Sequence, residues 1–139
     1  MRRFVAALFA TVALTFAHGA EAKARKPPVA FEIAPPPPSF GTVAALRKVA
    51  QEEMKKAGVL PRKQKRVVVS LAIKQTKSAP VACSVNATIR DARTGAVLAI
   101  IETGAHANGP ASPEMKKELA YAVVRDAVRR VPTALRAAN

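Results

Sequence analysis

The stretch that most constrains the fold of this chain is residues 81–105, where two strand-like runs flank a short turn that ends in glycine. Apolar and polar residues alternate strictly over residues 83–90, and a period of two places the apolar ones on a single, buried face of a strand. The turn at residues 91–95 begins with an aspartate, whose carboxylate can accept bonds from nearby backbone N–H groups, and its final Gly95 tolerates positive φ. The sequence therefore predicts a hairpin whose second strand, from residue 96 onward, is too uniformly apolar to assign an inward face. The inward residues of the first strand are Cys83, Val85, Ala87 and Ile89.

Three more segments carry the periodicity of regular secondary structure. Residues 67–74 alternate as a strand with one face toward water. Residues 42–57 have apolar side chains at helical spacing between a threonine N-cap and a glycine that ends the helix. A second helix is expected from Ser112, with proline at its first position, and Pro132 is expected to stop it.

The order helix, strand, strand, strand, helix predicts an α+β fold. We expect a two-layer sandwich, in which a three-stranded antiparallel meander is covered on one face by two helices. The folded domain is expected to span residues 40–132, with residues 133–139 as a frayed tail. Residues 23–39 are proline-rich and are expected to form a semi-rigid linker, although residues 29–33 alternate and could add an edge strand.

The start of the chain has the layout of a secretory signal peptide, which we place at residues 1–22. Two arginines precede an uncharged apolar run over residues 4–17, which is short of the roughly 20 residues that a membrane span needs. Cleavage sites of the A-x-A kind end at Ala22 and Ala24, and a third small-residue site ends at Gly19. We therefore expect a periplasmic or secreted protein; an uncleaved anchor is the alternative.

The charge of the chain favours anionic partners. The formal net charge is +14, and removal of residues 1–22 takes away two arginines and one glutamate, which leaves +13. Such a charge attracts lipid phosphates, cell-wall polymers, acidic proteins and nucleic acid at long range. Nucleic acid is the less favoured partner, because the chain has no tryptophan and one tyrosine for base stacking and no motif of a known nucleic-acid module.

The predicted meander gathers much of this charge at one end of the domain. The chain would enter the sheet after residue 66 and return to the 91–95 turn at that same end, where both helices would also finish. We call this region the basic end and predict that it contacts an anionic envelope component or an acidic protein; for residues 62–66 a merely solvated loop is the alternative. Its residues are Lys55, Lys56, Arg62, Lys63, Lys65, Arg66, Arg90, Arg93, Arg129 and Arg130.

The sequence gives no indication of catalysis, and we expect no enzyme activity, cofactor or metal site. His106 lies in a Gly/Ala-rich stretch without cysteines or carboxylates at metal-ligand spacing, so a solvent-exposed loop histidine is expected. Cys83 has no partner for a disulfide within the chain, and its place on the apolar face of a strand favours a buried thiol over a reactive or dimer-linking one.

One resemblance rests on the helix end at residues 57–60, the hairpin at residues 87–98 and the Ala/Val-rich last helix. In this layout the chain resembles small exported bacterial envelope proteins of the ABC-type transport auxiliary kind over residues 41–135, although it lacks their lipid-anchor cysteine. The resemblance implies an accessory subunit at the envelope and carries over no binding residue. Our expectation is a non-catalytic, exported accessory or binding protein; the alternative is a structural subunit that forms oligomers through the edge of its sheet.

Overall fold

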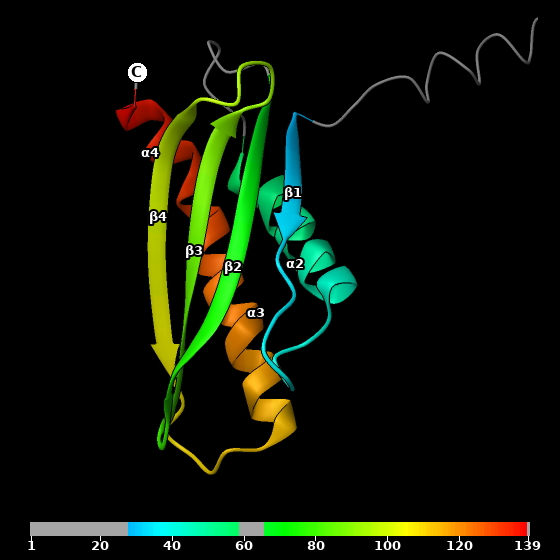
Figure 1. Ribbon diagram of the computed structural model, residues 1–139, viewed down its shortest axis with the longest axis vertical. Helices are drawn as coiled ribbons and strands as arrows, with labels where there is room; N and C mark the ends of the chain where they lie inside the picture. Colours follow the sequence, from blue (N-terminus) through cyan, green and yellow to red (C-terminus); the bar gives the residue numbers. More distant parts are fainter. Residues whose placement is uncertain (1–27, 59–65, 139) are drawn as a thin grey trace, which may run out of the picture.

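The computed structural model describes residues 28–58 and 66–138 as a four-stranded sheet with helices packed on one face (Figure 1). The α+β class predicted from the sequence is confirmed. The expected signal peptide, residues 1–22, lies outside the described residues. In chain order the elements are β1 (Val29–Ile33), α2 (Val43–Ala57), β2 (Val67–Ser78), β3 (Val81–Asp91), β4 (Val97–His106), α3 (Pro113–Arg129) and α4 (Val131–Ala137).

The sheet has the order β1-β2-β3-β4, in which β2, β3 and β4 form the expected antiparallel meander. The prediction of three strands is wrong, because β1 adds a fourth that lies parallel to β2, with Val29 opposite Val67 and Ile33 opposite Leu71. The edge strand that the alternation of residues 29–33 left open is thus confirmed, and it falls inside residues 23–39, the range predicted to be a linker. Its alternation places Val29 and Phe31 under the helices, at 7% exposure each. Burial of these two apolar side chains stabilises the pairing of this short strand with β2.

The C-terminal residues also differ from the prediction. Pro132 does not end the helical structure but lies in the first turn of α4, where its missing N–H and fixed φ are tolerated. Leu135 of α4 is fully buried, and α4 packs against β4. The segment expected to fray from residue 133 onward therefore belongs to the hydrophobic core as far as Leu135.

Helices α2 and α3 begin where a capping side chain stands ahead of them. The Thr42 hydroxyl accepts a hydrogen bond from the Ala45 N–H at 3.1 Å, and the Ser112 hydroxyl accepts one from the Met115 N–H at 3.1 Å. Both contacts satisfy donors that the first turn of a helix leaves free.

The structure assigns the inward face of β4, which the sequence did not determine. Ile101 and Thr103 are buried, and the Thr103 hydroxyl donates to the Val123 carbonyl of α3 at 3.2 Å.

The helices all lie on one side of the sheet, which leaves its other side uncovered in the part of the chain that the structure describes (Figure 1). We call this side the open face. Small and polar residues dominate it, as expected for a surface that meets water. Along the strands it carries Ala30 and Glu32; Val68, Ser70, Ala72 and Lys74; Ala82, Ser84, Asn86, Thr88 and Arg90; and Val97, Ile100, Glu102, Gly104 and His106. Within residues 28–58 and 66–138, no helix is long and apolar enough to cross a membrane.

Candidate functional site

Five segments of the chain meet at the end of the sheet where β2 begins, which is the upper end in Figure 1. The Ala92 N–H donates to the Arg66 carbonyl at 3.2 Å, so the β3–β4 turn lies beside the residue that precedes β2. The Val67 N–H donates to the Pro28 carbonyl at 2.9 Å, so the chain ahead of β1 arrives there too. The last turns of α2 and α3 are joined at the same end, since Arg129 Nε lies 3.0 Å from Glu53 Oε1.

Seven of the ten predicted basic-end residues belong to these segments, and three of the seven already have acidic partners. Arg129 pairs with Glu53 as above, and Arg130 Nη2 lies 3.1 Å from Asp126 Oδ2. Arg90 pairs with a third carboxylate described below. Arg62, Lys63 and Lys65 lie outside the described residues.

The other four side chains, Lys55, Lys56, Arg66 and Arg93, are exposed and form no ion pair with any residue of 28–58 or 66–138. We call these four the free basic group. Two of them lie in the last turn of α2, whose unpaired carbonyls carry a partial negative charge and reduce the repulsion among neighbouring cations. This group, rather than all ten residues, is the part of the described basic end that is available to an anionic partner.

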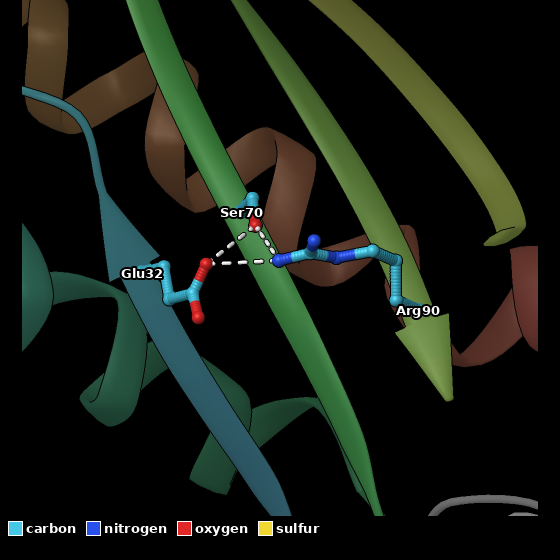
Figure 2. Close-up of polar contacts among 3 residues, drawn as sticks. All are labelled: Glu32, Ser70 and Arg90. Carbon is cyan, nitrogen blue, oxygen red and sulfur yellow. Dashed lines mark hydrogen bonds and ion pairs between the residues drawn. The ribbon is translucent and has the colours of Figure 1, made fainter. Parts of the chain in front are cut away.

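Arg90 instead forms side-chain contacts that hold the edge strand β1 to the rest of the sheet (Figure 2). Its Nη2 donates to Glu32 Oε2 at 2.9 Å and to the Ser70 hydroxyl at 3.0 Å, and that hydroxyl donates in turn to Glu32 Oε2 at 3.1 Å. The three residues come from β3, β1 and β2, so the contacts tie the short first strand across the second to the third. Arg90 therefore has a positioning role in the structure. Sequence reasoning missed it, although the alternation of residues 29–33 already placed Glu32 outward.

Asp91 shapes the turn at the basic end. Its Oδ1 accepts hydrogen bonds from the backbone N–H groups of Arg93 and Thr94 at 2.8 and 3.1 Å, and these bonds lower the pKa of the carboxyl below its usual value. Gly95 closes the turn at φ 75°, a value that favours glycine. The predicted hairpin turn is confirmed, and it holds Arg93 on the outside of the basic end.

Cys83 and His106 lie in different surroundings, the first buried and the second exposed. Cys83 is 1% exposed, and burial raises the pKa of its thiol to about 11, so the thiol stays protonated and weakly nucleophilic near neutral pH. His106 lies exposed at the end of β4. Among residues 28–58 and 66–138, no three histidine, cysteine or acidic side chains are grouped so as to hold a metal ion.

The outer edge of β4 is the second surface of interest. β4 is the last strand of the sheet, so the backbone groups along its outer side have no strand partner within the described residues. Val97 and Ile100, at 57% and 68% exposure, are the large apolar side chains that remain exposed in those residues. A long edge with exposed apolar side chains is a template for pairing with another strand.

Comparison with solved structures shows which proteins share this fold. A PelC dodecamer from Paraburkholderia phytofirmans in one crystal form has a TM-score of 0.54 and 12% identity, over 75% of this chain and 85% of that chain. A second crystal form of the PelC dodecamer gives a TM-score of 0.50 and 12% identity, over 73% and 86% of the two chains. A minor lipoprotein from Acinetobacter baumannii has a TM-score of 0.48 and 13% identity over 78% and 91%, a likeness too low to carry an argument.

At these identities the likeness establishes a shared fold and nothing further about function. No protein-family model matches the sequence, and no curated protein does. The comparisons do not single out the ABC-type transport auxiliary kind that the hairpin pattern resembles.

Proposed function

We propose that this protein is a non-catalytic accessory protein of the bacterial cell envelope, which binds an anionic envelope component through its basic end. The observation that carries the proposal is the free basic group, four exposed cations from three segments at one end of the domain. Export to the envelope is supported by the signal-like layout of residues 1–22. The resemblance to ABC-type transport auxiliaries fits such a role and rests on the layout of residues 41–135, not on matched binding residues.

The placement of the free basic group favours an extended anionic surface over a single small ion. Lys55 and Lys56 end α2, Arg66 precedes β2 and Arg93 lies in the β3–β4 turn, so their charges are spread across the whole end of the domain. A basic residue near an anionic membrane surface contributes about 1 kcal/mol of attraction, which salt screens. Four such residues together supply a salt-sensitive attachment without a shaped pocket.

Neutralising the free basic group is expected to weaken binding to anionic vesicles by about a hundredfold or more at low salt, because each of the four residues contributes about 1 kcal/mol. The variant is Lys55→Gln, Lys56→Gln, Arg66→Gln and Arg93→Gln together. Binding of the purified protein to phosphatidylglycerol vesicles is measured by co-sedimentation at rising salt, with neutral phosphatidylcholine vesicles for comparison.

A matched control has the same loss of charge in the first halves of α2 and α3, away from the basic end. It combines Arg47→Gln, Lys48→Gln, Lys116→Gln and Lys117→Gln. The control should bind much as the unaltered protein does. Equal losses in the two variants would show that net charge alone drives binding, and this result would overturn the assignment to the basic end.

A second candidate function is a structural subunit that self-associates through the outer edge of β4. The exposure of Val97 and Ile100 along this edge favours it. PelC, which shares the fold, is a dodecamer. Pairing of β4 with a second copy would satisfy its free backbone groups and cover both apolar side chains.

Self-association predicts an oligomer that persists at high salt, because strand pairing and apolar contacts are screened little. Ile100→Lys should shift the mass measured by light scattering after size exclusion toward the monomer. Ala72→Lys, on an inner strand of the open face, should leave the mass unchanged. A monomer at the highest concentration measured would exclude this function, and a loss of oligomer in the Ala72 variant would show that copies pack across the open face and not along the β4 edge.

A further inference from the structure

A hollow of about 440 Å³ lies on the open face at the end of the sheet opposite the basic end. The end of β2, the start of β3, the turn between them and the last residues of β4 line it, so three strands contribute to one site. None of the functions considered above uses this region. The residues that matter for the argument are Thr76, Lys77, Ala82, Ser84, Gly104 and His106.

The floor of the hollow is low because its residues are small. Ser84 lies opposite Gly104 in the β3–β4 ladder, and Ala82 lies opposite His106. The fold does not require glycine at position 104: a Cβ atom there would lie 3.5 Å from the Cys83 carbonyl oxygen, an ordinary contact. The absence of a side chain at Gly104 therefore leaves space above the sheet, and it is not needed to avoid a steric clash with the neighbouring backbone.

A β-bulge turns a lysine toward this space. Gln75 lies opposite Cys83, but the next pair is Lys77 with Ala82, so Thr76 is the extra residue of the bulge. Without the bulge, Lys77 would oppose Val81, which is buried on the helix side. The Gln75 side-chain amide spans the bulge and donates to the Lys77 carbonyl at 3.1 Å. The irregularity thus places Lys77 on the open face.

The polar side chains around the hollow are donors of hydrogen bonds, and Pro80, Ala82, Cys83, Gly104 and Ala105 complete its lining. Lys77 supplies an ammonium, His106 a ring N–H, and Ser84 and Thr76 supply hydroxyls. The nearest acidic residue along β4 on this face, Glu102, lies one row further along the ladder, opposite Asn86, and does not line the hollow. A cationic, hydroxyl-bearing hollow without a carboxylate of its own fits an oxyanion.

We propose that this hollow binds a small ligand through a carboxylate or phosphate group, with Lys77 as the charged contact and Gly104 leaving room for the ligand. The site is separate from the basic end and does not depend on the function proposed there.

The test is a titration of the purified, isotope-labelled protein with inorganic phosphate and, separately, with glucuronate, followed by amide NMR. We expect saturable shifts that centre on Ser84, Gly104 and Lys77, with a Kd of about 1 mM or tighter for at least one probe. Comparison of the two probes shows whether the site takes phosphate or a sugar carboxylate. Shifts that increase linearly without saturation for both probes would overturn the proposal.

Two variants separate the hollow from general charge effects. Gly104→Val fills the space with a strand-favouring residue and should abolish saturation while the melting temperature is kept. Lys77→Gln should weaken binding by about tenfold, since a charge-assisted hydrogen bond is lost. Lys116→Gln, with the same loss of charge on α3, should bind as before, and so should the variant with a neutralised basic end. Equal weakening in the Lys77 and Lys116 variants would show that the hollow is not the site.

Discussion

Replacing Phe31 with alanine should lower the free energy of unfolding by about 3–5 kcal/mol, the usual cost of deleting a buried phenylalanine side chain. Phe31 is 7% exposed and belongs to β1, which α2 covers on the helix side of the sheet. The loss would be a large fraction of the stability of a small domain, which is typically about 5–15 kcal/mol. Urea unfolding followed by circular dichroism measures it.

The matched control for this substitution is Ala30→Ser, one position earlier on the open face of the same strand. An exposed change of this kind is expected to stay within about 0.5 kcal/mol of the unaltered protein. A Phe31 variant with equally unchanged stability would mean that β1 does not pack in solution and that residues 23–39 act as the linker first expected.

Replacing Leu135 with alanine should cost about 2–5 kcal/mol, because the side chain is fully buried and leaves a cavity under α4. The expected effect is large for a residue only four positions from the C-terminal Asn139. Thermal and urea unfolding of the purified variant measure the loss.

Arg136→Ala provides the comparison, since Arg136 is exposed on the same helix and contacts only the Thr133 hydroxyl, at 3.3 Å, among the described polar groups. We expect a change within about 0.5 kcal/mol there. If the two substitutions proved equally mild, the last helix would be frayed, as its sequence first indicated.

The parts of the fold that the sequence predicts correctly are those set by local chemistry. The alternation of residues 83–90, the turn ending in Gly95 and the helix caps at Thr42 and Ser112 each depend on neighbours within a few positions. The meander follows, because short connections between strands leave few alternatives.

Two features could not be predicted from local patterns: the parallel pairing of β1 with β2, and the continuation of helical structure past Pro132. The pairing of β1 with β2 joins segments 38 positions apart, as the Glu32–Ser70 contact shows, and nothing local to residues 29–33 specifies a parallel neighbour. Pro132 is compatible both with the end of one helix and with the first turn of the next. The burial of Leu135 decides between them, and burial is a property of the folded core.

The basic end could be predicted only in outline. Strand directions bring its segments together, but ion pairing depends on side-chain positions that topology does not specify. Two of its arginines pair with Glu32 and Glu53, which topology alone could not place there: Glu32 belongs to the strand that the alternation of residues 29–33 only allowed, and Glu53 is buried where α2 meets α3. The hollow was missed for a related reason, since a bulge at Thr76 has no signature in the alternation around it.

The parallel pairing of β1 also determines how the domain would be oriented by anything attached ahead of it. A chain that enters an antiparallel edge strand would arrive at the hairpin end, beside the hollow. Here the Val67 N–H donates to the Pro28 carbonyl, so β1 starts at the basic end. A tether ahead of Pro28 would therefore present the cationic side to the surface that holds it and leave the hollow pointing outward.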